Sequence, residues 1–138
     1  DFPFFRYAQV LMMKAECLMR TGDAGSAAQI VSDVRKRNFS DPAKAVVTAA
    51  ALTGNTRYRY GYVEKYVMTD RGNTDVVQYG GFMDELGWEF AWEAQRRRDN
   101  IRFGIFTKKS WLSHKPQQDG RTVFMIPQAA VNSNPKLQ

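Results

Sequence analysis

Residues 7–34, YAQVLMMKAECLMRTGDAGSAAQIVSDV, carry the plainest structural pattern in the chain. Apolar side chains recur at helical spacing on both sides of a central Thr21-Gly22-Asp23 break. Gly22 can adopt the left-handed conformation that closes a helix, and Asp23 can accept hydrogen bonds from the free N–H groups of the next one. The pattern predicts two helices joined by a tight turn, a helical hairpin over residues 6–38.

The two predicted helices present different apolar faces to a core. The face predicted for the first helix consists of Tyr7, Val10, Leu11, Ala15 and Leu18. The face predicted for the second consists of Ala24, Ala27, Ala28, Val31 and Val34. Two helices of this length joined by a tight turn are typical of tetratricopeptide-type repeats, in which one hairpin cannot bury its outer face alone. We therefore expect a mainly α fold built from tetratricopeptide-like hairpins.

Residues 39–81 change character and predict a loop or hairpin insertion. Asp41-Pro42 is a favourable helix start, so a short helix is expected over 43–52. Tyrosines then alternate with other residues over 56–69, a period of two that indicates a strand. A turn at 70–73 and a short return strand over 74–79 complete the expected insertion.

Residues 82–104 predict one long helix, followed by an extended tail over 105–138. Acidic residues lead this helix and arginines follow, which matches the helix dipole. Glu93 lies four residues before Arg97, the favourable order for an ion pair. In the tail, the apolar run 123–127 is expected to dock on the helices. The predicted structural ion-pair cluster comprises Glu89, Glu93, Arg96, Arg97, Asp99 and Arg102.

Composition and charge limit the function classes. The 138 residues suit one domain or a piece of one, and 13% aromatic content argues against intrinsic disorder. The net charge of +6 favours acidic partners. Its two dense clusters, at 35–37 and 96–98, fall near predicted helix C-termini, where they complement the dipole. With no nucleic-acid-binding motif beside them, no nucleic-acid partner is expected. No apolar run is long enough to span a membrane.

No catalytic or metal-binding constellation is recognisable. The single histidine, His114, falls in a predicted surface loop, and the single cysteine, Cys17, falls among apolar neighbours as a structural thiol. Glu85, Glu89 and Glu93 form a ladder along one helix, whereas a glycosidase needs two carboxyl groups facing a bond across a cleft. We expect no catalytic residue, metal or cofactor, and hence no enzyme.

Three aromatic residues are candidates for ligand contact. Tyr58 and Tyr60 alternate in the predicted strand, and Trp111 falls in a predicted loop. A tyrosine or tryptophan offers a flat apolar face and a polar tip, the combination that binds sugar rings. The same stripe also fits half-buried structure, and the residues alone leave both interpretations open.

Four stretches in order resemble the C-terminal region of SusD/RagB-like proteins. Residues 1–16, DFPFFRYAQVLMMKAE, are similar to the family's opening "FRYAdvLLmyAEa", and Val-Arg-Lys-Arg at 34–37 resembles its "vR.Ra". Residues 88–104, WEFAWEAQRRRDNIRFG, resemble "rElawEGhRr.DLiRfG". Residues 123–127 with 132–138 resemble "lfPIP..El..NPnl.QN". Ala94 and Asn100 depart from the family's Gly and Leu, at packing positions.

The resemblance implies a function that composition does not. Members of this family are non-catalytic lipoproteins on the outer face of the outer membrane in Bacteroidetes. They bind glycans, or sometimes peptides, and form a lid over a SusC-like TonB-dependent transporter. Their scaffold is tetratricopeptide-like. Residues 1–138 would then be the C-terminal segment of a longer chain, whose lipid anchor lies upstream and is not Cys17.

Two function hypotheses remain. The first is capture of an oligosaccharide or polysaccharide at the cell surface and its delivery to the transporter. The alternative is a tetratricopeptide-like scaffold that contacts a protein partner. No ligand-contacting residue of the family falls on a matched position, so Tyr58, Tyr60 and Trp111 rest on their chemistry alone.

Overall fold

The computed structural model describes residues 5–116, 119–134 and 136, and helices dominate them. The α-helices are α1 (Tyr7–Arg20), α2 (Ala24–Lys36), α3 (Ala49–Thr53), α4 (Gly80–Glu89), α5 (Arg96–Arg102) and α6 (Gln128–Ser133). The 3-10 helices are η1 (Pro42–Ala45) and η2 (Asp119–Thr122), and the strands are β1 (Gly61–Glu64), β2 (Val67–Asp70) and β3 (Trp111–Leu112). This confirms the mainly α fold with a small hairpin insertion.

The α1–α2 hairpin forms as the sequence predicts. Thr21 Oγ1 donates to the carbonyl oxygen of Cys17 at 2.9 Å, which satisfies the end of α1. Gly22 then adopts φ +102°, a left-handed conformation that residues with a Cβ rarely take. The Asp23 carboxylate accepts from Ser26 N at 3.0 Å and caps α2. Helix-stop and helix-start signals in three consecutive residues therefore set the turn.

The buried face of α1 differs from the predicted one. Tyr7 and Val10 are 74% and 50% exposed, whereas Met12 and Met19 are 2% and 3% exposed. Unbranched methionines can fill the irregular space beside the alanines of α2, so the helix turns that side inward. Cys17, predicted to be buried, is exposed. The core that joins α1 to α4 comprises Ala8, Met12, Ala15, Met19, Ala27, Ala28, Val31, Val34, Leu52, Phe82, Leu86 and Phe90.

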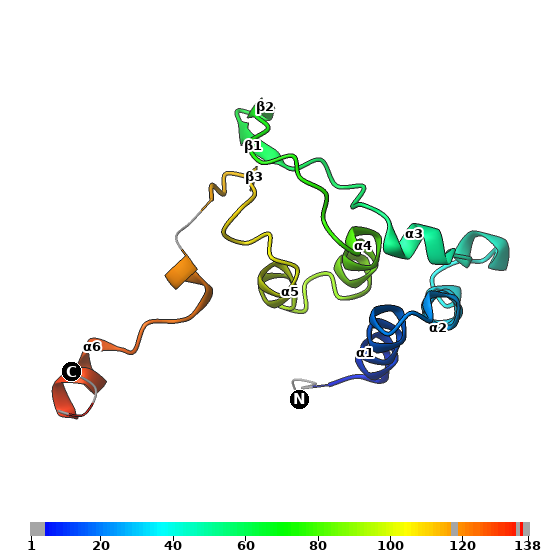
Figure 1. Cartoon of the computed structure of the whole chain (residues 1–138), viewed down its shortest axis with the longest axis horizontal. Coiled ribbons are helices and arrows are strands. Elements are labelled where there is room, and N and C mark those ends of the chain that lie inside the picture. The colour runs from blue at the N-terminus through cyan, green and yellow to red at the C-terminus, as the bar shows by residue number, and fades with distance from the viewer. Residues whose placement is uncertain (1–4, 117–118, 135, 137–138) are drawn as a thin grey trace.

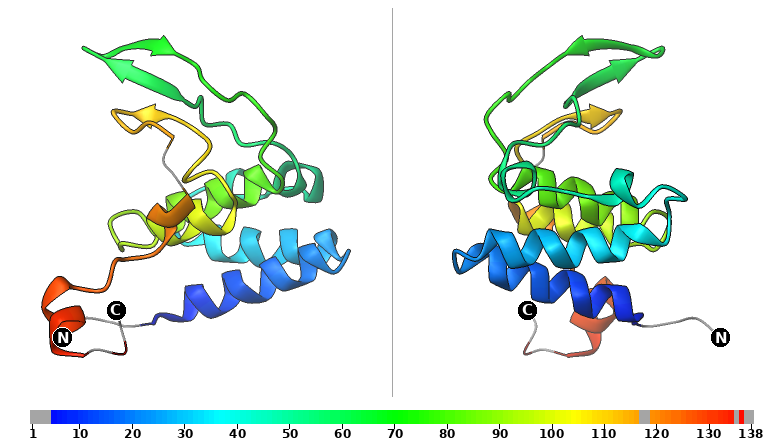
Figure 2. Two further views of the ribbon diagram at one scale, coloured as in Figure 1. Left: turned by 60° about the vertical axis from the view of Figure 1, so that its left-hand side comes forward. Right: turned by 90° about the vertical axis from the view of Figure 1, so that its right-hand side faces the viewer.

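The molecule is layered, with α4 and α5 between the α1–α2 hairpin and the small sheet (Figures 1 and 2). Helix α4 begins almost in contact with α3: Gly81 N donates to Gly54 O at 3.1 Å. A Cβ added at Gly81 would lie 1.8 Å from the carbonyl oxygen of Ala51. Only glycine permits this approach, which fixes α4 over the core.

The single long helix expected over 82–104 is wrong, because the chain breaks between α4 and α5. Trp92 and Ala94 adopt φ +65° and +57°, left-handed values that an α-helix cannot contain. The break lets Glu93 turn toward Arg6, 87 residues earlier in the chain, to which it is hydrogen bonded. A contact so distant in sequence overrides the local helical pattern.

The insertion forms a three-stranded sheet in the order β2-β1-β3. Strands β1 and β2 are antiparallel, and β3 lies parallel to β1. The turn falls at Lys65 and Tyr66, both with positive φ, rather than at 70–73 as predicted. Trp111 and Leu112, predicted as tail, form β3 and bring the C-terminal part of the chain to the tyrosine-bearing segment.

The rest of the tail is less extended and less docked than predicted. It contains η2 and α6, and Phe124 and Met125 in the apolar run are 84% and 85% exposed. Figure 2 shows α6 projecting away from the helical layers. Residues 117 and 118 of the predicted tail lie outside the described residues, as do residues 1–4 and 135, 137 and 138 of the terminal motifs. Within the described ranges, no helix has both the length and the hydropathy of a membrane span.

Candidate binding site

A buried carboxylate on α4 holds the loop that carries the candidate tyrosines. Asp84 is 5% exposed. Its two oxygens accept from Thr56 Oγ1 at 2.6 Å and from the backbone N–H of Arg57 at 2.7 Å. Hydrogen bonds to a charged acceptor are among the stronger ones in proteins. The loop is therefore anchored to the helical core immediately before Tyr58.

The structure brings the three predicted ligand-contact residues together. Tyr58 and Tyr60 lie with ring centroids 4.9 Å apart at 70°. Tyr60 and Trp111 lie 6.3 Å apart at 81°. Both are edge-to-face arrangements, which aromatic rings favour. Tyr60 is only 8% exposed and is part of the structure, whereas Tyr58 is 43% exposed and offers a free surface. Each of the two interpretations drawn from the sequence therefore fits one tyrosine.

Trp111 is positioned by the sheet and by a histidine. Its Cα pairs with Gly61 in the β1–β3 register. The His114 ring stacks on the indole at 3.8 Å and 19°, and His114 Nε2 lies 2.9 Å from the carbonyl oxygen of Phe106. His114 is thus partly buried support for Trp111, and its prediction as a solvated loop residue is wrong. The strand pairing and the stacked imidazole together hold Trp111 in place.

A hollow of about 160 Å³ lies among these aromatics, lined by Tyr58, Tyr60, Arg96, Asn100 and Trp111. The Tyr60 hydroxyl and the side-chain oxygen of Asn100 are buried and have no hydrogen-bond partner among the described residues. Burial raises the pKa of Tyr60 to about 12, although the nearby positive charge of Arg96 opposes the shift. The hydroxyl therefore keeps its proton even at mildly basic pH.

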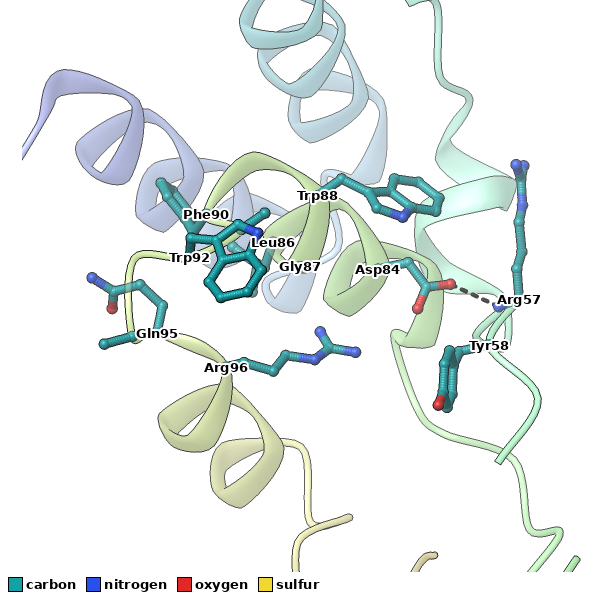
Figure 3. A pocket seen from close by; sticks show the side chains of 12 residues that line it. Arg57, Tyr58, Asp84, Leu86, Gly87, Trp88, Phe90, Trp92, Gln95 and Arg96 are labelled. Carbon is teal, nitrogen blue, oxygen red and sulfur yellow. Dashed lines mark hydrogen bonds between the residues drawn. The ribbon is translucent and has the colours of Figure 1, made fainter. Parts of the chain in front are cut away.

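A larger hollow of about 800 Å³ adjoins the same residues and includes Tyr58 and Arg96 in its wall. Its rim holds Trp88 and Trp92, which are 56% and 104% exposed. In Figure 3 the Arg96 side chain extends from α5 toward α4, with Tyr58 and the two tryptophans around it. Arg96 Nη1 donates to the carbonyl oxygen of Met83 at 2.8 Å, which fixes the guanidinium in this position.

Together the two hollows form a site with exposed aromatic faces and a few polar groups. Tyr58 and Arg96 belong to both hollows and join them. Aromatic faces stack on apolar ring surfaces, and the hydroxyl, amide and guanidinium groups can hydrogen bond to ligand oxygens. Such a surface can hold a ring-shaped polar ligand without breaking a bond in it.

The predicted ion-pair residues find partners that the sequence pattern did not indicate. Glu93 does not pair with Arg97. Arg6 instead bridges Glu89 and Glu93, with nitrogen–oxygen distances of 2.7 and 2.6 Å. Arg37 also pairs with Glu89, whose side chain is only 6% exposed. The two carboxylates raise the pKa of Arg6. The network therefore ties the start of α1 to the end of α4.

The other residues of the predicted ion-pair cluster do not join this network. Arg97 donates to the backbone oxygen of Arg121 at 3.0 Å, and Arg102 pairs with Glu16 on α1. Asp99 is 1% exposed, and neither carboxylate oxygen has a hydrogen-bond partner among the described residues. Its nearest cation is Arg98, 3.6 Å away. Burial raises the pKa of Asp99.

Sequence reasoning missed several residues of this site. The sequence pattern places Asp84, Trp88, Trp92, Arg96 and Asn100 on one predicted helix, with Arg96 in the ion-pair cluster, and does not indicate a ligand site. No local signal distinguishes an exposed tryptophan from a buried one when a helix is expected to continue. In the part of the chain that the structure describes, no group of three His, Cys, Asp or Glu side chains could hold a metal ion.

Comparisons with known proteins agree with the resemblance drawn from the motifs. The chain is 28% identical to the starch-binding protein SusD of Bacteroides thetaiotaomicron over 112 residues. That alignment covers 81% of this chain but 14% of the relative, so the chain spans a small part of the relative's length. None of the solved structures matches. The sequence profile of the SusD family matches residues 1–138. This chain therefore belongs to the SusD family.

Proposed function

We propose that this chain binds a glycan, without catalysis, at the hollow between Tyr58, Tyr60 and Trp111. The observation that carries the proposal is the convergence of three aromatic residues from two distant segments on one hollow with unpartnered polar atoms. The name of its relative, a starch-binding protein, supports a glycan as the ligand class.

In this proposal a sugar ring stacks on the exposed face of Tyr58, and its hydroxyl groups bond to the polar atoms of the hollow. The Arg96 guanidinium, which lines both hollows, donates to a sugar hydroxyl group. Its hydrogen bond to Met83 fixes it before the ligand arrives, so binding does not have to order this side chain. Further sugar units extend along the larger hollow past Trp88 and Trp92.

The family resemblance supports a wider role for the protein that contains this chain. We propose that residues 1–138 are its C-terminal segment, and that a lipid anchor elsewhere holds it on the outer face of the outer membrane. There it delivers the glycan to a SusC-like TonB-dependent transporter. The site residues bind and orient the ligand and leave its bonds intact.

Calorimetric titration with a panel of neutral oligosaccharides, maltoheptaose first, tests the binding proposal. Tyr58→Ala is expected to weaken binding about tenfold, because a stacked aromatic contributes about 1.5 kcal/mol. Tyr66→Ala is the matched control, since Tyr66 is fully exposed outside the site. Equal affinities for both variants would contradict the site, and release of new reducing ends would contradict the non-catalytic role.

An interaction scaffold is the second candidate, and the outer face of α1 favours it. Tyr7, Val10 and Met13 are at least half exposed on that helix. Apolar side chains gathered on one face are typical of protein-interaction surfaces. Absence of heat with every neutral and anionic glycan tested would favour this role over glycan binding.

A further inference from the structure

A third hollow, of about 170 Å³, borders the tyrosine-bearing loop and differs from the first two in its chemistry. Tyr58 and Tyr60 form part of its wall. Its other lining residues are mainly polar or charged, and the basic ones are Arg57, Arg59, Arg71 and Lys109. The stacking surface is therefore flanked by a concentration of positive charge.

Three of these cations are free to bind a ligand. Arg57, Arg59 and Arg71 are exposed, and none of their guanidinium groups has an ion-pair or hydrogen-bond partner among the described residues. Most other arginines of the chain are engaged: Arg6, Arg35 and Arg37, for example, each pair with a glutamate. An arginine without a partner beside a binding surface presents a planar set of donors that suits a carboxylate or a sulfate.

Lys109 contributes charge but is already held in place. It is 5% exposed, and its ammonium donates to the carbonyl oxygens of Asn73 and Asp75 at 3.0 and 2.5 Å. It therefore holds the loop before α4 in place as part of the wall of the hollow. Among the residues that the structure describes, the hollow is lined by four basic side chains and one acidic side chain, Asp75, so the net charge of its lining is +3.

We infer that this site selects an anionic glycan, with the carboxylate or sulfate of one sugar unit held by Arg59 and Arg71 while a neighbouring ring stacks on Tyr58. The inference rests on the proposed function and names its substrate class. Arg57 lies at the junction, because it lines both this hollow and the large one. The net charge of +6 favours approach of such a ligand.

The test compares two glycans with the same sugar rings, of which only one is charged. Tetragalacturonate and its methyl ester share the same sugar rings, but the ester carries no carboxylate. Calorimetric titration of the full chain should give an affinity for the acid about tenfold or more above that for the ester. Added salt should lower the affinity for the acid. A sulfated galactan tetrasaccharide shows whether sulfate serves as well as carboxylate.

Variants test whether Arg59 and Arg71 cause the preference for the acid over the ester. Arg59→Gln combined with Arg71→Gln should bring the affinity for the acid down to that for the ester. Arg121→Gln is the matched control, because Arg121 is exposed and lies outside the hollow. Thermal melting confirms that the variants are folded, which is expected because the guanidinium groups have no partners to lose.

The outcomes separate the inference from the proposed function. Equal affinity for acid and ester would overturn the anionic selectivity and leave glycan binding standing. Absence of binding to any glycan would overturn both. Binding of acid that the double variant leaves unchanged, or that an RNA oligomer matches, would show general attraction of polyanions and overturn the assigned site.

Discussion

Asp84 connects the helical core to the loop that carries the candidate binding residues. It lies on α4, and its carboxylate accepts hydrogen bonds from the side chain of Thr56 and the backbone N–H of Arg57. From the sequence, the residue types of Tyr58 and Trp111 sufficed to nominate them. Asp84 could not be nominated, because an acid early in a helix has an equally good local explanation in the helix dipole.

Asp99 gives the structure a pH dependence of definite sign. Burial raises the pKa of this carboxyl group, with Arg98 opposing the shift. The folded state then holds the proton more tightly than the unfolded state. The stabilising effect of protonation is fully present below the ordinary pKa of an aspartate and is lost as the pH rises through the higher folded pKa. At neutral pH the buried charge of Asp99 therefore lowers the free energy of unfolding.

Asp99→Asn removes that cost. Relative to the original protein, the variant should gain about 3 °C in melting temperature at pH 7 and lose this advantage as the pH is lowered below the ordinary aspartate range. Asp33→Asn is the control. The hydrogen bond from Lys36 lowers the pKa of Asp33, so this carboxylate stabilises the folded state at neutral pH, and its replacement should lower the melting temperature there. An advantage of Asp99→Asn that does not change with pH would contradict the assignment.

Among the elements, the α1–α2 hairpin was predictable and the α4–α5 break was not. The hairpin is set by adjacent residues, with Gly22 ending one helix and Asp23 starting the next. The break depends on Arg6, which draws Glu93 away from the helical path. A period of 3.6 residues describes what a segment can form alone, and it carries no information about a partner 87 residues away.

Replacing Arg6 tests this account of the break. Arg6→Ala leaves the buried Glu89 with one cation, Arg37, and leaves Glu93 with none, so the free energy of unfolding should fall by about 3 kcal/mol. Arg97→Ala removes hydrogen bonds to the backbone oxygens of Arg121 and Thr122 and cation–π contacts with the Phe106 and Phe124 rings, and should cost about 1 kcal/mol. Urea unfolding measures both, and similar losses for the two variants would contradict the proposed clamp.

At the scale of the whole molecule, the site is assembled from segments that no local pattern relates. The tyrosine loop, the α4–α5 region and β3 meet because the α4 glycines pack against α3 and because β3 pairs with β1. The family resemblance predicted the helical scaffold, but it marks no residue as a ligand contact, although Trp88, Trp92, Arg96 and Asn100 of the candidate site lie within its 88–104 motif. From the sequence, the candidate site could therefore be predicted only as a set of residue types. That these residues lie together around two hollows is a property of the tertiary structure.

A crystal structure of the protein with a bound oligosaccharide tests glycan binding at this site most directly. We expect a sugar ring stacked on Tyr58, a sugar hydroxyl group within hydrogen-bond distance of the Arg96 guanidinium, and an anionic group, where the ligand has one, at Arg59 and Arg71. A glycan bound on another surface, with the hollow beside Trp111 filled only by water, would contradict it.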